Sequence, residues 1–228
     1  MKNLQIFALG LALLVAAGCK TPKLLLRSDD AQVSYAIGQS IGKDLKAQDL
    51  GVSSGKIAAG IKDAMAGQSA LSDEEIKKVL TAFQMKQMAK QEAKFKSEGE
   101  KNAKEGEAFL ADNAKKPGVV ALASGLQYKV LKSGVGRSPR LTDVVLAHYV
   151  GTLLNGKEFD SSYKRKAPAT FPVRGVIPGW TEALQKMKVG DKWQLFIPSK
   201  LAYGERGAGG VIGPNQTLIF EVELLGIK

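Results

Sequence analysis

The sequence predicts an α+β protein: an N-terminal all-helical region, a long connecting helix, and a C-terminal antiparallel sheet wrapped on one short helix. Three observations predict this arrangement. Apolar residues recur every three or four positions up to about residue 88, which is typical of amphipathic helices. A stretch composed mostly of Lys, Glu and Ala follows. Beyond Pro117-Gly118, short alternating runs replace the helical pattern, as expected for strands.

The first residues have the order of a secretory targeting segment. A positive start is followed by an apolar run from Leu4 to Ala17, which predicts a signal peptide over residues 1–18. This run is shorter than the about 20 apolar residues that a membrane-spanning helix needs. Ala16-Ala17-Gly18-Cys19 resembles a bacterial lipoprotein signal, in which Cys19 is acylated, although Ala16 stands where Leu is usual. The alternative is an ordinary signal peptide with an incidental cysteine.

Acylation of Cys19 would explain a lone cysteine in an exported protein, where no intramolecular disulfide can form. Residues 19–27 would then be a lipid-anchored tether. Lys20, rather than Asp, follows the cysteine. By analogy with lipoprotein sorting in Gram-negative cells, this favours the periplasmic side of the outer membrane, with surface exposure as an alternative.

Residues 28–71 are expected to form two helices. Asp30 is the expected cap of the first, and the second begins at Ser53 or Ser54 and ends near Gly67. The apolar stripe of the first helix is Val33, Ile37, Ile41 and Leu45. So few large apolar residues make a poor independent core. We therefore expect a homodimer formed through residues 28–90, because a two-fold interface is self-complementary.

A long helix is predicted over residues 72–116. The capping box Ser72-Asp73-Glu74-Glu75 marks its start. Its apolar face fades after Met88, so the second half is expected to be a solvent-exposed stalk that Gly99 and Gly106 allow to bend. The alternative is a disordered charged linker.

Residues 117–228 are predicted to form the sheet domain. Strand-like runs occupy residues 126–131, 144–153, 192–197 and 217–225, with a helix at 179–187 and a tight turn at 189–191.

Five motifs recur between these elements, separated along the chain. They are His148-Tyr149, Phe159-Asp160-Ser161-Ser162, Val176-Ile177-Pro178-Gly179-Trp180, Ala202-Tyr203-Gly204 and Thr217-Leu218-Ile219-Phe220. From about Gly125 to the C-terminus, their order and spacing resemble the FKBP-type peptidyl-prolyl cis-trans isomerases. Ser34-Tyr35-Ala36-Ile37-Gly38 resembles, over a shorter motif, the dimerisation module of the macrophage infectivity potentiator group of that family.

The resemblance implies a half-open, five- or six-stranded sheet and rotation of X–Pro bonds in exported, unfolded or partly folded polypeptides, without a cofactor. It also implies binding of tacrolimus and rapamycin. Trp180 would form the pocket floor, while Tyr203 and the backbone N–H of Ile177 would bond substrate carbonyls. Asp160 would face the rotating imide, oriented by Tyr149 and Arg165. The implied catalytic residues are Asp160, Tyr203 and Tyr149, and the implied substrate-binding residues are Phe159, Arg165, Phe171, Val176, Ile177, Trp180, Ile212 and Phe220.

Two positions depart from the family pattern and put one pocket wall in question: Ala169 stands where Phe is frequent, and Ala208 stands where His is frequent. Taken singly, the strand aromatics are ordinary core residues, and only their joint order indicates a pocket.

The residues themselves argue against other classes of site. A single histidine and a cysteine assigned to lipid disfavour a transition-metal site, and no Gly-x-Ser-x-Gly elbow is present.

The net charge of +11 arises from 33 Lys and Arg against 22 Asp and Glu, dispersed along the chain. Without a dense basic block, it does not indicate nucleic-acid binding. Two main functions remain: an isomerase, with accompanying chaperone activity, or a client-binding chaperone in which isomerisation is secondary. A third, a surface adhesion or virulence factor, rests on family analogy alone.

Overall fold

The computed structural model describes residues 26–228, so the expected signal peptide and Cys19 lie outside the described residues. The chain divides into two compact units, residues 1–81 and 82–228. Among the described residues, no helix is both long enough and apolar enough to cross a membrane.

The first unit contains α1 (Asp29–Ala47), α2 (Ser54–Met65) and the start of α3 (Asp73–Asn113). Ser28 caps α1, because its backbone is extended and its Oγ accepts from the N–H of Ala31 at 3.2 Å. The expected cap, Asp30, is wrong, since it already lies within the first helical turn. No residue of either helix is buried.

The start of α3 confirms the capping box. The backbone N–H of Ser72 donates to Glu75 Oε2 at 2.8 Å, and the N–H of Glu75 donates to Ser72 Oγ at 3.2 Å. These reciprocal bonds satisfy two donors that the first helical turn leaves without partners. The bond from the Ser72 backbone also lowers the pKa of Glu75.

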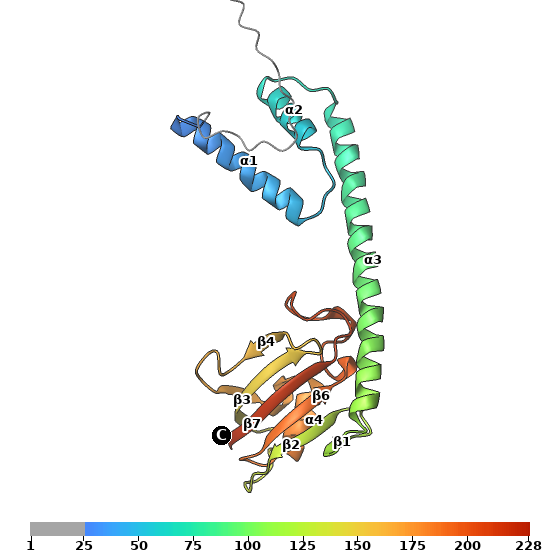
Figure 1. Cartoon of the computed structure of the whole chain (residues 1–228), viewed down its shortest axis with the longest axis vertical. Coiled ribbons are helices and arrows are strands. Elements are labelled where there is room, and N and C mark those ends of the chain that lie inside the picture. The colour runs from blue at the N-terminus through green and yellow to red at the C-terminus, as the bar shows by residue number, and fades with distance from the viewer. Residues whose placement is uncertain (1–25) are drawn as a thin grey trace, which may run out of the picture. The chain divides into compact units, whose positions relative to one another are not determined.

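The second unit is built on one antiparallel sheet (Figure 1). Its strands are β1 (Val119–Ala121), β2 (Gln127–Lys132), β3 (Val144–Leu153), β4 (Glu158–Ser161), β5 (Ala169–Pro172), β6 (Lys192–Ile197) and β7 (Leu218–Ile227). Their order is β1-β2-β6-β7-β3-β4, with β5 also paired to β3. The sheet has seven strands rather than the expected five or six. The strands β1, β4 and β5, which lie outside the four runs predicted from the sequence, have only three or four residues, too few for a recognisable alternation.

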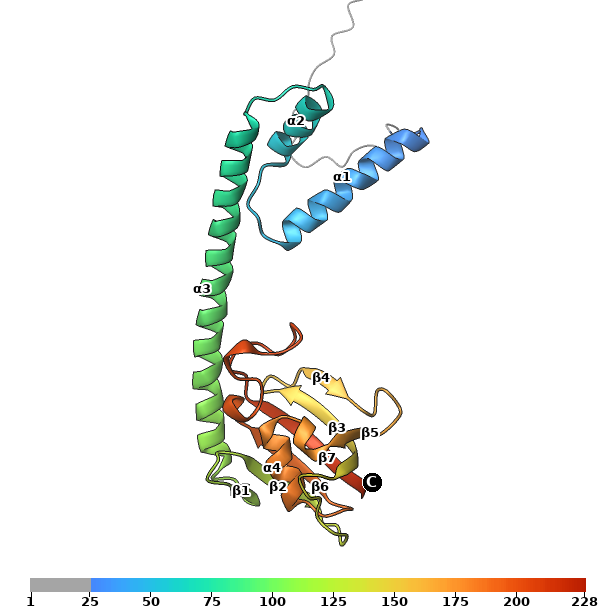
Figure 2. The same cartoon turned by 180° about the vertical axis from the view of Figure 1, so that it is seen from behind.

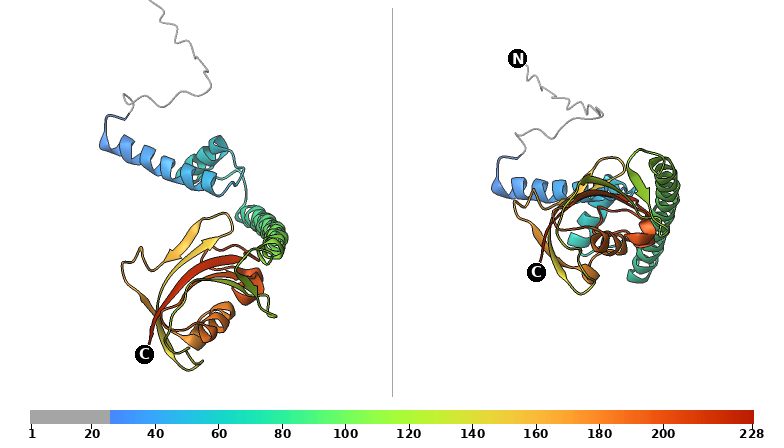
Figure 3. Two further views of the ribbon diagram at one scale, coloured as in Figure 1. Left: turned by 60° about the horizontal axis from the view of Figure 1, so that its bottom comes forward. Right: turned by 90° about the horizontal axis from the view of Figure 1, so that it is seen from below.

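The sheet curves around α4 (Pro178–Lys186), as Figure 3 shows from two directions. Burial along β3 alternates residue by residue, because successive side chains point to opposite faces. The inward side chains pack with Leu184 and Met187 in a single core that includes Leu195, Ile197 and Val222. This packing fixes α4 against the inner face of the sheet.

The second half of α3 packs against the sheet, so the expected solvent-exposed stalk is wrong. Its residues Gly99, Asn102, Gly106 and Asn113 are buried. Asn113 Nδ2 donates to Gln127 Oε1 at 3.0 Å, and Gln127 Nε2 donates to the carbonyl of Leu110 at 2.8 Å. Figures 1 and 2, from opposite sides, show this half of α3 beside the sheet and the segment between β6 and β7. Phe109 contacts Phe196 with ring centroids 5.9 Å apart, but the fully buried residues of α3 are glycines and asparagines, which is why hydropathy did not reveal the contact.

Candidate active site

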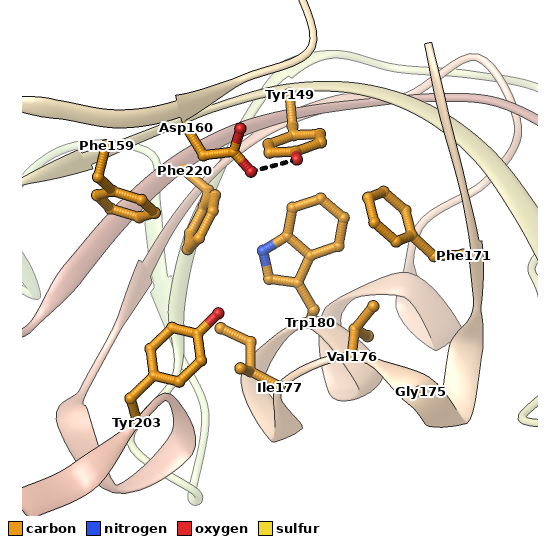
Figure 4. A pocket seen from close by; sticks show the side chains of 10 residues that line it. All are labelled: Tyr149, Phe159, Asp160, Phe171, Gly175, Val176, Ile177, Trp180, Tyr203 and Phe220. Atoms are coloured by element: carbon orange, nitrogen blue, oxygen red, sulfur yellow. Dashed lines mark hydrogen bonds between the residues drawn. The ribbon is translucent and has the colours of Figure 1, made fainter. Parts of the chain in front are cut away.

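An aromatic cavity of about 400 Å³ opens between the inner face of the sheet and the start of α4 (Figure 4). It is lined by Tyr149, Phe159, Asp160, Phe171, Gly175, Val176, Ile177, Trp180, Tyr203 and Phe220. These residues come from β3, β4, β5, α4, β7 and the loops between them. Every side chain predicted for the site, apart from Arg165 and Ile212, therefore lines one cavity.

Trp180 is held at the cavity floor by three other rings. Its indole makes edge contacts with Tyr149, Phe171 and Phe220, with ring centroids 5.3, 5.5 and 5.3 Å apart. Such tilted contacts are the favoured geometry for aromatic pairs. The side chain is buried, and its Nε1 has no hydrogen-bond partner among the residues that the structure describes. The three ring contacts hold the floor in place, and its one polar group is the unpartnered indole N–H.

Asp160 is the one carboxylate on the cavity wall, and two groups bind it. The hydroxyl of Tyr149 donates to Asp160 Oδ2 at 2.5 Å, and Arg165 forms an ion pair with Asp160 Oδ1. Arg165 also donates to the Tyr149 hydroxyl at 2.6 Å. Partial burial alone would raise the pKa of Asp160, but the hydrogen bonds from Tyr149 and Arg165 outweigh it and lower the pKa. Asp160 is therefore ionised at neutral pH and cannot serve there as a general acid.

The pKa of Tyr149 is shifted in the opposite direction from that of Asp160. Its burial, followed by its hydrogen bond to the Asp160 carboxylate, raises the pKa of the phenol. Its backbone is also fixed, because its N–H donates to the buried Ser162 Oγ at 2.8 Å. The cavity wall thus carries a fixed carboxylate and a neutral phenol at ordinary pH.

Besides the indole N–H of Trp180, two hydrogen-bond donors among the described residues remain available at the cavity. Tyr203 is 41% exposed, and Figure 4 shows its hydroxyl directed into the cavity. Ile177 is the N-cap of α4, and within residues 26–228 its backbone N–H has no acceptor. Ile177 is only partly buried, so a ligand carbonyl entering the cavity could accept from this N–H.

The sequence matches the profile of the FKBP-type peptidyl-prolyl cis-trans isomerases over residues 136–225. It also matches the profile of the domain amino terminal to these isomerases over residues 30–130. It is 45% identical to the outer membrane protein MIP of Legionella longbeachae over 229 residues, covering all of this chain and 98% of that protein.

The chain belongs to the FKBP-type peptidyl-prolyl cis-trans isomerases. It is 43% identical to the peptidyl-prolyl cis-trans isomerase Mip of Coxiella burnetii, over 99% of this chain and 97% of that protein. The structure resembles the crystal structure of FkpA from Escherichia coli, with a TM-score of 0.74 and 42% identity, covering 89% of this chain and 98% of that chain. Membership of the family confirms the predicted fold class and the predicted isomerase activity.

Two residues assigned to the FKBP-type pocket lie outside its lining. Ile212 is buried in the core and forms an isolated bridge with Ala208, so the structure does not place it on the cavity lining, and its assignment to the pocket stays a prediction. Arg165 does not line the cavity either, and it contacts the site through Asp160 and Tyr149. Ala169 packs partly buried against the core and does not line the cavity.

Two glycines contribute to this FKBP-type site without having been predicted. Gly175 lines the wall beside Val176. Gly151 lies on β3 behind two cavity rings, where an added Cβ would lie 2.6 Å from Phe159 Cζ and 2.7 Å from Phe220 Cε1. The only sequence signal for Gly151 is a glycine within a long β-rich run, which commonly marks a close approach.

Proposed function

We propose that the cavity binds a prolyl residue of an exported polypeptide above Trp180 and lowers the barrier to rotation of the preceding amide bond. The main support for this proposal is that Trp180 and Tyr203 line one aromatic cavity. Its single carboxylate, Asp160, is already paired with Arg165. In this proposal, Tyr203 and the N–H of Ile177 bind flanking carbonyls, and Asp160 faces the imide carbonyl.

Rotation about an X–Pro bond is slow because it requires loss of amide resonance, with a barrier of about 18–20 kcal/mol. At the twisted geometry the carbonyl is no longer conjugated with nitrogen, so the imide is less polar than in its planar form. An apolar aromatic cavity stabilises the twisted form more than the planar form, and only such differential binding accelerates the reaction. No nucleophile or proton transfer is required.

The test compares tyrosine and aspartate variants in a proline-containing peptide assay. We expect Tyr203→Phe and Asp160→Ala each to lower kcat/KM by about fivefold or more, consistent with the loss of one hydrogen bond or of the oriented carboxylate. Tyr163→Phe is the matched control, because Tyr163 is similarly exposed, at 44%, and does not line the cavity. Unchanged kcat/KM in both site variants, with native thermal unfolding, would contradict the site assignment.

The same assay tests the ligand class. The family resemblance and the shape of the cavity support binding of the macrolides tacrolimus and rapamycin over Trp180. Either compound is expected to inhibit the isomerase competitively. Inhibition that is not competitive with the peptide would place the macrolide elsewhere.

The finer cellular assignments are also proposals. The match to a relative named as an outer membrane protein supports export, with Cys19 acylated and the protein on the periplasmic side of the outer membrane. Mass spectrometry of the mature N-terminus tests this, since an unmodified thiol at Cys19 would contradict the anchor.

Exposed apolar side chains of α1, including Val33 and Ile37 at 57% and 56%, support a homodimer. Accompanying chaperone activity is tested by suppression of client aggregation by the Tyr203→Phe protein.

A further inference from the structure

The buried face of α3 is bonded to the segment between β6 and β7. Asn102, only 8% exposed, donates from Nδ2 to the carbonyl of Pro214 at 2.8 Å. Asn215 donates from its own Nδ2 to the carbonyl of Gly99 at 3.4 Å. Figures 1 and 2 show the same segment beside α3 from both sides. These bonds attach the loop to a rigid helix.

The attachment continues to Tyr203 through one further hydrogen bond. The backbone N–H of Asn215 donates to the carbonyl of Gly204 at 2.8 Å. Asn215 is covalently linked to Pro214, and Gly204 to Tyr203, so two hydrogen bonds and two peptide links connect Asn102 with Tyr203. We call this chain of bonds the relay. Because it is short, the position of Asn102 constrains the position of Tyr203.

Close packing adds a further contact at the C-terminal end of the segment. A Cβ on Gly106 would lie 2.3 Å from Thr217 Oγ1. Thr217 is buried and immediately precedes β7, whose Phe220 lines the cavity. The helix therefore contacts the segment at Pro214, Asn215 and Thr217, just before β7.

The segment needs such support because its own backbone is permissive. Gly204, Gly207, Gly209 and Gly210 all have positive φ angles. Glycines lose the most conformational freedom on folding, so a glycine-rich loop is costly to hold in one conformation. Tyr203, at its start, is itself half-exposed and receives little support from packing.

We propose that Asn102 is a positioning residue for catalysis, which holds the Tyr203 hydroxyl over Trp180 through Pro214 and Asn215. The second half of α3 is then part of the catalytic unit, although it lies outside residues 136–225 that match the isomerase profile. This inference rests on the proposed role of Tyr203. It assigns to the connecting helix a function in substrate binding that its composition does not indicate.

The test uses Asn102→Asp in the full chain, because the carboxylate keeps the size of the side chain but cannot donate to Pro214. With a proline-containing peptide, KM is expected to rise about fivefold, the equivalent of one neutral hydrogen bond, while kcat stays unchanged. Tyr203 binds ground state and transition state alike, so its displacement affects KM. Partial unfolding would instead lower the apparent kcat at constant KM.

Lys104→Gln is the matched control, because it changes the net charge by the same amount at an exposed position of the same helix. It is expected to leave KM unchanged. The decisive comparison is a double-mutant cycle: in the Tyr203→Phe background, Asn102→Asp should raise KM by less than about twofold, because coupled residues are not additive. Equal effects in both backgrounds would overturn the relay.

Failure of this inference is distinguishable from failure of the site assignment. If Tyr203→Phe raises KM and Asn102→Asp does not, only the positioning role is contradicted. If Tyr203→Phe has no effect, the proposed site itself is wrong. Should Asn102→Asp fail to fold, Asn102→Ala removes the same donor to the Pro214 carbonyl without placing a charge at the buried position. It is expected to raise KM in the same direction, and an unchanged KM would overturn the proposal.

Discussion

The ring of Tyr149 stands perpendicular to the indole of Trp180, at 89° and with centroids 5.3 Å apart. The same tyrosine binds the Asp160 carboxylate through its hydroxyl at 2.5 Å. One side chain therefore supports both the apolar floor and the single charge of the cavity. Replacing Tyr149 with Phe keeps the ring contact and removes the bond to Asp160.

Tyr149→Phe is expected to lower kcat/KM by about two- to tenfold, because Asp160 loses one of its two orienting partners. The variant should unfold at nearly the wild-type temperature, since the ring remains in place. In this variant the pKa of Asp160 should rise, because the hydrogen bond from Tyr149 is one of the interactions that lower this pKa. NMR titration of the Asp160 carboxyl measures this shift, and an unchanged pKa would contradict the bond.

The rate should be independent of pH over a wide range. The pKa of Asp160 lies below its usual value and that of Tyr149 above its usual value, so neither group changes its charge between about pH 5 and pH 9. kcat/KM measured across this interval should be flat. A bell-shaped profile centred near neutrality would reveal an essential acid or base that the proposed mechanism does not contain.

The lowered pKa of Asp160 also determines how the stability of the fold changes with pH. The depressed pKa of Asp160 stabilises the folded state above its unfolded pKa, and this stabilisation is lost as the pH falls through the folded pKa. Thermal unfolding in acid should show Asp160→Asn losing less stability than wild type below about pH 4. Because Asp160 is 41% exposed, solvent screening keeps the difference small.

Gly151→Ala is expected to impair catalysis through the cavity rings. The new Cβ would lie within 2.7 Å of atoms on Phe159 and Phe220, so both rings must move. Overpacking of this kind costs about 1–3 kcal/mol of stability, and displaced cavity walls should lower kcat/KM by about tenfold. Gly226→Ala is the control, because nothing lies within 4 Å of an added Cβ there. Equal kcat/KM for the two variants would show that the rings tolerate displacement.

Gly106→Ala should destabilise the second unit although alanine favours a helix by about 1 kcal/mol over glycine. Its Cβ would approach Thr217 Oγ1 to 2.3 Å. Thermal unfolding should therefore occur at a lower temperature than in wild type. Adding Thr217→Ala removes the clashing oxygen and should restore part of the loss. A Gly106→Ala protein more stable than wild type would show that this contact is loose.

The dimer is tested by one charge on the apolar stripe of α1. Ile37, 56% exposed, is expected to be covered by a second copy of the chain, so Ile37→Glu should give a monomer in sedimentation. Gln39→Glu adds the same charge at an exposed position on another face of α1 and should remain dimeric. Activity toward short peptides should persist in both, and a monomeric wild type would contradict the proposal.

Long periodic segments were predictable from sequence, and short ones were not. The bounds expected for β3 and β6 agree with the structure, because a β-rich run of ten residues and an alternation over six are strong signals. β1, β4 and β5 are defined by their partners in the sheet rather than by a pattern of their own. Strand identity at that length depends on tertiary pairing, which local composition does not record.

The residues of the site were likewise predictable only where they belong to a distinctive sequence motif. Aromatic motifs located the cavity rings, because their joint order is distinctive. Asn102 gave no such signal, since an amide among Lys and Glu is typical of an exposed helix, and Gly106 was interpreted as a point of bending rather than of close packing. Ile212 lies in the core rather than on the cavity lining, and sequence does not separate these places because an apolar residue suits both.

The two tryptophans of the chain occupy different surroundings. Trp180 forms the cavity floor, whereas Trp193 stacks on Tyr128 at 4.1 Å, away from the cavity lining. Replacing Trp193 with Phe would leave a single indole, whose fluorescence then reports directly on occupancy. Ligand affinity could be read optically from the unlabelled protein, without following turnover.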